Sequence, residues 1–247
     1  MDAGRCARAD RVGVVRPGPW LPVQVLGRLA GAGAPRAVVP RWIVRLVASL
    51  ALAIVVQSIV TGQTGNMEVG LLSAPGVKPQ VRGAVYRRQS GSLQPGVLVL
   101  HGSGGLRDEY YVTASELSRS GFVVLLVDLF AETGSVDAGS SKRLEAWSTW
   151  QATVRNALDC LRKQAGVDPG RIGIVGYSRG GWLAFTTAGN APDVRAIATF
   201  YPVGSQPTDW QPAGPAILVL SGQLDRYADP ALVARLDAGL RAAGRSV

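Results

Sequence analysis

The sequence is poor in two residue types that carry much of enzyme chemistry, histidine and cysteine. Its 247 residues include one histidine, His101, and two cysteines, Cys6 and Cys160. One histidine excludes a metal site built from several histidines of this chain, and two cysteines cannot form a disulfide framework. We therefore expect no metal and no cofactor. The single histidine also restricts every mechanism that requires an imidazole.

Charged residues are scarce too, at 17 % of the chain, where about 25 % is usual. The formal net charge is nevertheless +9. Residues 1–45 hold eight arginines and two acidic residues and so contribute +6, which leaves +3 for the remainder. Because a nucleic-acid footprint lies on the folded domain, this distribution indicates no nucleic-acid partner. The hydrophobic fraction of 47 % allows a sizeable core and excludes global disorder.

The first sixty residues differ in character from the rest. Residues 1–40 are interrupted by prolines and show no sustained periodicity, which is typical of a disordered leader or of a start codon assigned too far upstream. Residues 41–62 place arginines before an apolar run, 46–60, of signal-peptide length. We expect an export signal, hence a periplasmic or secreted protein. An uncleaved anchor, tethering the chain through 43–60, and a buried helix are the alternatives, although the run is short for a span of ~20 residues.

The body of the chain, residues 63–247, alternates short apolar runs with amphipathic stretches. This alternation predicts an α/β fold with a mostly parallel sheet and helices on both faces. Asp108 and Asp229 are expected as helix caps, and Asp168–Gly170 is expected as a turn. The expected strands are 97–100, 122–128, 171–176, 194–201 and 216–220, and the expected helices are 108–120, 144–161, 178–188 and 230–243.

The segment Gly176-Tyr-Ser-Arg-Gly180 follows an expected strand and opens an expected helix. A G-x-S-x-G sequence in that context is typical of a nucleophile elbow, whose sharp turn exposes the serine at the top of the sheet. Ser178 is therefore the candidate nucleophile, and the amide of Arg179 is a candidate oxyanion donor. The alternative is a glycine-rich strand–helix turn with a capping serine.

Two further segments follow strand ends, where ligands bind in such sheets. The loop His101-Gly-Ser-Gly-Gly105 could supply a second oxyanion amide, from Ser103 first and Gly102 next. Asp225, after the strand 216–220, could orient a histidine; the alternative is a carboxylate that merely caps or turns its loop. Weaker candidates for the acid are Asp128, Glu132 and Asp209.

These segments resemble the dienelactone hydrolase family of α/β-hydrolases. The resemblance spans about 81–247 and is carried by Gly96–Leu106, Phe122–Asp128, Asp168–Gly181 and Gly222–Asp225. It implies the α/β-hydrolase fold, a small-molecule ester or lactone substrate, and a serine or cysteine nucleophile with an acid and a later histidine. Ser178 matches the nucleophile and Asp225 the acid. A serine where the best-known members carry cysteine favours a general ester hydrolase.

The family's histidine is the point of departure. It lies roughly thirty residues after the acid, whereas 22 residues follow Asp225 here and none is histidine. The resemblance implies that His101 supports the oxyanion loop together with Gly102, and does not act as the base. We therefore expect a C-terminally truncated serine esterase, with the last strand, the last helix and the catalytic histidine beyond Val247. The alternatives are a catalytically inactive α/β-hydrolase-like protein, for binding or decayed, and a membrane-tethered interaction protein.

Overall fold

The computed structural model describes residues 10–11, 67–74, 76–134, 143–204 and 209–245. The predicted export signal or anchor at 41–62 lies outside the described residues, and so does the predicted leader at 1–40 apart from Asp10 and Arg11. Within the described ranges, no helix combines the length and the apolar character that crossing a bilayer requires.

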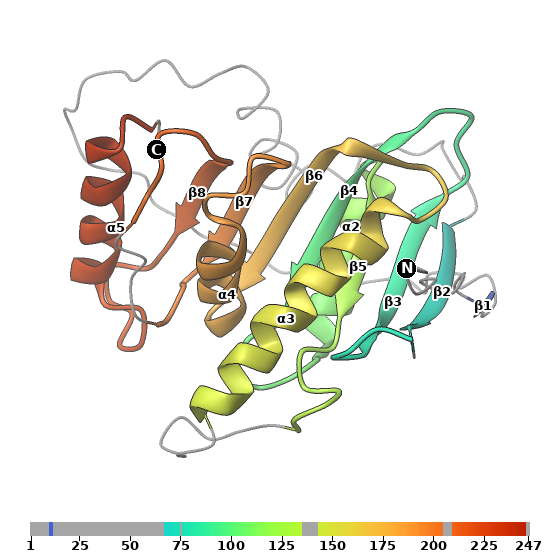
Figure 1. Cartoon of the computed structure of the whole chain (residues 1–247), viewed down its shortest axis with the longest axis horizontal. Coiled ribbons are helices and arrows are strands. Elements are labelled where there is room, and N and C mark those ends of the chain that lie inside the picture. The colour runs from blue at the N-terminus through green and yellow to red at the C-terminus, as the bar shows by residue number, and fades with distance from the viewer. Residues whose placement is uncertain (1–9, 12–66, 75, 135–142, 205–208, 246–247) are drawn as a thin grey trace.

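The described residues form an eight-stranded sheet with the order β1-β2-β3-β5-β4-β6-β7-β8 (Figure 1). The pairs from β1 to β5 are antiparallel, and the pairs β5–β4, β4–β6, β6–β7 and β7–β8 are parallel. The carboxyl ends of β4, β6, β7 and β8 therefore meet at one edge. The strands are β1 (Asp10–Arg11), β2 (Met67–Ala74), β3 (Val81–Arg88), β4 (Gln94–Leu100), β5 (Val123–Val127), β6 (Val167–Tyr177), β7 (Val194–Phe200) and β8 (Ala216–Leu220).

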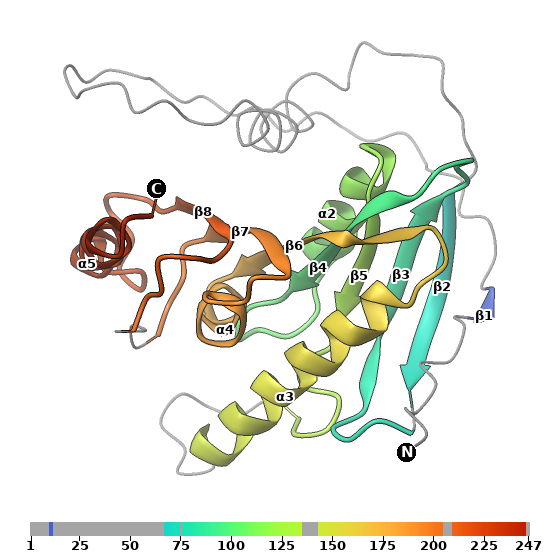
Figure 2. The same ribbon diagram turned by 45° about the horizontal axis from the view of Figure 1, so that its top comes forward.

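Helices cover both faces of this sheet, as the sequence predicts. Helix α2 packs on one face, and α3 and α4 pack on the other (Figure 2). Residues of α3, α4 and α5 belong to one apolar cluster, and residues of α2 belong to another. The two faces of the sheet therefore carry separate cores. This arrangement confirms the expected fold class. The helices are α2 (Asp108–Arg119), α3 (Arg143–Arg162), α4 (Arg179–Ala188) and α5 (Pro230–Ala242).

The central strands explain why their sequences are continuously apolar. Leu98 and Leu100 of β4 pack into the core beneath α3 and α4, while Val97 and Val99 pack into the core beneath α2. Successive side chains of a strand point to opposite faces, and here both faces are covered. All five residues of β5 are buried for the same reason.

Arg245 closes the described part of the chain against two distant elements. Its guanidinium donates to the carbonyl oxygen of Gly189, at the end of α4, at 2.7 Å, and to that of Pro215, just before β8. Its guanidinium carbon also lies 5.4 Å from the centroid of the Trp210 ring, within the ~6 Å limit of a cation–π contact. The side chain is nearly buried, with 9 % of its surface exposed.

Two local expectations differ from the structure, and two strands were not predicted. Asp108 is the first residue of α2, because Arg107 occupies the N-cap position with extended backbone and no side-chain capping bond forms. Asp168–Gly170 lies inside β6, where Asp168 pairs with Pro95 of β4 although its side chain accepts the turn-like hydrogen bond from the Gly170 amide. The antiparallel strands β2 and β3 were not predicted, because β2 is only partly buried.

Candidate active site

Ser178 occupies a strained turn between β6 and α4. Its φ of 51° and ψ of −117° lie outside the regions that residues other than glycine usually adopt. A Cβ atom on Gly176 would lie 2.6 Å from the Cα of Gly181, and one on Gly180 would lie 2.5 Å from the carbonyl oxygen of Leu100. The two glycines of the motif are thus required by backbone that passes too close for any side chain.

Hydrogen bonds on both sides of Ser178 hold this turn in place. Its amide donates to the carbonyl oxygen of Phe200 at 2.9 Å. Its own carbonyl oxygen accepts from the amides of Trp182 and Val203, each at 3.2 Å. The turn is therefore tied to the end of β7, to the first turn of α4 and to the loop after β7.

His101 is completely buried at the end of β4, and backbone groups surround both of its ring nitrogens. Nδ1 lies 2.7 Å from the carbonyl oxygen of Gly102, and Nε2 accepts from the amide of Leu129 at 3.0 Å. Because the Leu129 amide can only donate, Nε2 is the acceptor, and the proton of the neutral ring lies on Nδ1. The nearest carboxylate oxygen, on Asp128, lies 3.6 Å from Nε2. The ring thus joins the 101–105 loop to the loop after β5.

The loop at residues 101–105 passes directly beside Ser178. A Cβ atom on Gly102 would lie 3.3 Å from the Cβ of Ser178. The Gly102 amide donates to the hydroxyl of Tyr110 at 3.2 Å, and the Gly102 carbonyl oxygen accepts from the amide of Gly105. The Ser103 amide has no hydrogen-bond partner among the described residues. Of the two amides considered from sequence, Ser103 is therefore the one available to a ligand.

Asp225 stands in a short turn after β8. Its Oδ1 atom accepts from the amides of Tyr227 at 2.8 Å and Ala228 at 2.9 Å. These bonds, Ala228 before Tyr227, lower the pKa of the Asp225 carboxyl below its usual value. The group is consequently a carboxylate at neutral pH, and no donor within the described ranges occupies Oδ2.

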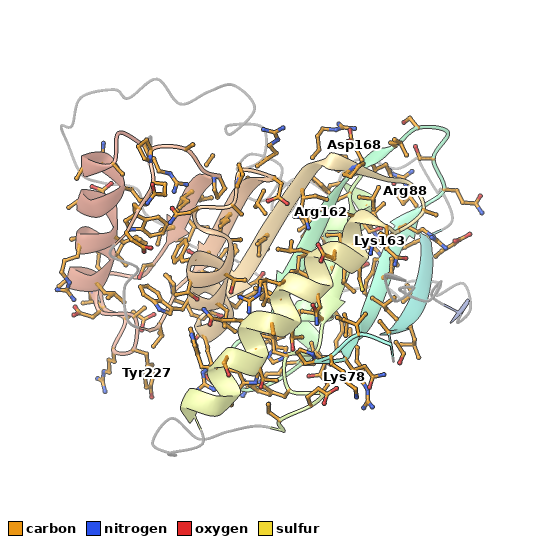
Figure 3. All side chains as sticks on the ribbon, viewed as in Figure 1. Lys78, Arg88, Arg162, Lys163, Asp168 and Tyr227 are labelled. Carbon is orange, nitrogen blue, oxygen red and sulfur yellow. The ribbon has the colours of Figure 1, made fainter. Side chains whose placement is uncertain are left out.

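A cleft of about 590 Å³ opens at this edge of the sheet. It brings together four residues predicted from sequence, whereas the other predicted residues are absent from its lining. Gly102 lies beside Ser178, Asp128 lies beside His101, and Glu132 accepts from the amide of Gln80. Figure 3 shows Tyr227 at the edge to which the strands point, opposite Asp168. The lining residues are Ser103, Ser178, Arg179, Tyr201, Val203, Asp225 and Tyr227.

Four residues around the cleft were not identified from sequence. Tyr201 and Val203 follow β7, and their position just past a strand that ends at this edge was an available signal. Tyr227 lies two residues after Asp225, and this proximity in sequence was also an available signal. Tyr110 is a buried position of α2, and no pattern distinguishes it from an ordinary core residue.

The side chain of Arg179 extends toward α3. Its guanidinium carbon lies 5.0 Å from the ring centroid of Trp150, which is within the range of a cation–π contact. Trp150 is fully buried and donates through Nε1 to the hydroxyl of Thr133 at 2.8 Å. In the described part of the chain, no group of three or more histidine, cysteine, aspartate or glutamate side chains could hold a metal ion.

Residues 81–247 match the dienelactone hydrolase family. Among solved structures, the protein named m3DLH has 24 % sequence identity to the chain and a TM-score of 0.63. A dienelactone hydrolase-like promiscuous phosphotriesterase, P91, from metagenomic libraries has 22 % identity and the same TM-score of 0.63. Both similarities cover 72 % of this chain and 78 % of the other. No curated protein matches the sequence.

Proposed function

The chain belongs to the dienelactone hydrolase family, and on this premise we propose that it hydrolyses carboxylic esters through an acyl-enzyme on Ser178. Family membership supports a hydrolase. The ester substrate and the serine mechanism are the proposal. The observation that carries it is the left-handed backbone of Ser178, at φ 51°, in a cleft that Asp225 also lines.

The proposed reaction has two steps. The Oγ atom of Ser178 attacks the ester carbonyl carbon and loses its proton to a base, and the carbonyl oxygen becomes an oxyanion. The amides of Ser103 and Arg179 donate to that oxyanion. The tetrahedral intermediate then collapses, the C–O bond to the alcohol breaks, and the base returns the proton to the departing oxygen. Water clears the acyl-enzyme by the same route.

The base is the part of the proposal that this chain's own residues do not supply. Its single histidine, His101, is fully buried, and backbone groups engage both ring nitrogens. A serine without a base is a weak nucleophile at neutral pH. We therefore propose that the base is a histidine beyond Val247, oriented by Asp225. The engagement of His101 equally favours the second candidate, a catalytically inactive protein.

Added imidazole separates these two candidates. Hydrolysis of p-nitrophenyl acetate is measured at neutral pH with rising imidazole, for the 247-residue chain and for Ser178→Ala. The variant reports the hydrolysis that imidazole causes unaided. If imidazole can replace the missing base, the chain exceeds Ser178→Ala, and the difference saturates. Ser120→Ala is the matched control, because the Ser120 hydroxyl donates to the Glu116 carbonyl oxygen on α2, away from the cleft lining.

Mass spectrometry completes the test by locating the acyl group. An acetyl adduct on the peptide that contains Ser178, absent from Ser178→Ala, is the expected intermediate. Equal rates for the chain and for Ser178→Ala at every imidazole concentration, with no adduct, would contradict the serine mechanism and favour the inactive protein.

Export and the absence of a nucleic-acid partner remain part of the proposal. The arginines and apolar run of residues 41–62 support a signal peptide. Expression with the leader intact, followed by N-terminal sequencing, tests it. A mature chain that begins near Gln63 in the soluble exported fraction supports cleavage, whereas an intact chain in the membrane fraction supports a tether through 43–60.

A further inference from the structure

Tyr201 is the second non-glycine residue in the described ranges with a left-handed backbone, and like Ser178 it lines the cleft. Its φ is 39°, a conformation that a bulky aromatic residue adopts only at a cost. Such strain persists where surrounding structure enforces it, and it gathers at sites of function. The proposed mechanism gives Tyr201 no role, so its strained backbone requires a separate account.

The surroundings of Tyr201 fix it with respect to the nucleophile and the acid. Its amide donates to the carbonyl oxygen of Leu220, the last residue of β8, at 2.6 Å. The residue before it accepts from the Ser178 amide, and Val203 donates to the Ser178 carbonyl oxygen. Tyr201 therefore stands between the turn of Ser178 and the strand that leads to Asp225.

Other aromatic rings support the Tyr201 ring. Its centroid lies 6.3 Å from that of Tyr177. Tyr177 stacks on Phe200 at 4.8 Å and contacts Tyr110 edge-on at 5.0 Å. Burial raises the pKa of Tyr201, and that of Tyr177 to about 12, so both phenols are neutral at neutral pH. The cleft consequently presents an uncharged ring of fixed orientation.

A second tyrosine lines the same cleft. Tyr227 is 85 % exposed, and Tyr201 is 39 % exposed. Figure 3 shows Tyr227 projecting beyond the strand ends, from the loop between β8 and α5. Exposed aromatic rings in a cleft are a favourable surface for another ring, which gains offset or edge contacts beyond simple burial.

The position of the two tyrosines indicates which part of an ester they contact. In the proposed function, on which this inference rests, the base oriented by Asp225 protonates the departing alcohol oxygen. Tyr227 shares a loop with Asp225, and Tyr201 lies beside the strand that carries it. The alcohol part therefore lies on their side. We infer that Tyr201, together with Tyr227, selects esters whose alcohol part carries an aromatic ring.

Two esters with the same carbon skeleton test this inference. Benzyl acetate and cyclohexylmethyl acetate share the acyl group and differ in the aromaticity of the ring. Their hydrolysis is followed by pH-stat in the presence of imidazole, with Ser178→Ala as blank and each rate divided by that for hydroxide. We expect kcat/KM to favour the benzyl ester by about threefold to tenfold.

Substitutions assign this preference to Tyr201. Tyr201→Leu should bring the ratio close to one, while Tyr201→Phe, which retains the ring, should preserve it. Leucine meets the same left-handed backbone as tyrosine, so the comparison does not relieve strain. The control is Tyr111→Leu, which removes a tyrosine of similar exposure, 40 %, on α2 and outside the cleft lining; it should leave the ratio unchanged.

A binding measurement keeps this inference distinct from the proposed function. Saturation-transfer NMR compares benzyl alcohol with cyclohexylmethanol on Ser178→Ala, which needs no catalysis. Preferential binding of benzyl alcohol that Tyr201→Leu abolishes would support the inference even if no ester were hydrolysed. Equal binding of both alcohols, or a preference that Tyr201→Leu leaves intact, would overturn it while leaving ester hydrolysis standing.

Discussion

The Asp225 carboxylate has a local role and a proposed catalytic role, and two substitutions separate them. Asp225→Asn keeps a side-chain oxygen for the amides of Tyr227 and Ala228 but removes the charge that stabilises an imidazolium. We expect the imidazole-assisted rate to fall by about tenfold or more with little change in stability. Asp225→Ala should lower both the imidazole-assisted rate and the stability. Equal rates for Asp225→Asn and the parent chain would contradict the proposed role.

The same residue has a predictable pH dependence. Amide hydrogen bonds place the pKa of Asp225 below its usual 3.8, so the unfolded chain binds this proton more readily than the folded one. The contribution of these bonds to stability is therefore complete above pH 3.8 and is lost as pH falls through the lowered pKa. NMR shifts of the Tyr227 and Ala228 amides should remain constant down to that region. A transition at higher pH would contradict the assignment.

His101 is expected to act on stability. His101→Ala would leave the buried Leu129 amide without its partner, and the Gly102 carbonyl oxygen would keep only the Gly105 amide as a donor, which costs about 1–3 kcal/mol. Urea denaturation measures this loss. The side-chain amide of His101→Asn can still reach the neighbouring Gly102 carbonyl oxygen. The stability of this variant should therefore lie between that of the parent chain and that of His101→Ala. If His101 had no structural role, the urea denaturation midpoint of His101→Ala would equal that of the parent chain.

At this scale, sequence reasoning succeeds where a residue's role depends on a local pattern. The spacing of Gly176, Ser178 and Gly180 encodes a turn whose steric needs are local, so it is recognisable from five letters. Tyr110 receives its role from an amide on another element, Gly102. Such a contact depends on how α2 packs on the sheet, which no local pattern specifies. The roles assigned to Ser178, Asp225, Arg179 and Ser103 remain predictions.

Among the elements, α5 shows how far a local signal extends. Asp229 accepts from the Ala231 amide, Pro230 is the first helical residue, and Gly244 has a φ of 74°. The expected cap, start and stop are therefore confirmed to within about one residue. The strands β2 and β3 were missed for the opposite reason. They form an antiparallel pair of consecutive strands, but partial burial leaves β2 without the continuous apolar run that marks the central strands.

The α5 cap provides a prediction for this element. Asp229→Ala removes the side-chain acceptor of the Ala231 amide and should lower the free energy of unfolding by about 1 kcal/mol. Asp229→Asn retains an acceptor and should restore most of it. Thermal denaturation of the two variants checks the difference. A similar loss for both would indicate that charge, and not the cap, stabilises the start of α5.

For the whole molecule, Arg245 joins parts of the fold that are distant in sequence. Arg245→Ala removes both guanidinium hydrogen bonds and the contact with Trp210 and should cost about 1–3 kcal/mol. Arg245→Lys keeps the charge but lacks the planar fork that serves two carbonyl oxygens. It should recover less than half of the loss in urea denaturation. Full recovery by lysine would show that charge alone matters.

The parallel sheet and its two-sided cover could be predicted because buried parallel strands are apolar throughout, as in β4 and β5. The strand order could not be predicted, because it does not follow the sequence: β5 lies between β3 and β4, and β4 lies between β5 and β6. That crossover is set by how the helices pack over the sheet. Family resemblance supplies it, since the whole domain shares one fold.

The contact of Arg245 with the end of α4 can form only after residue 245 has been synthesised. Gly189 and Arg245 are 56 residues apart, and ribosomes add ~5–20 residues per second. The end of α4 is thus translated roughly 3–11 s before the side chain that binds it. During that interval the end of α4 lacks this tie. A ribosome that pauses between α4 and α5 would lengthen that interval.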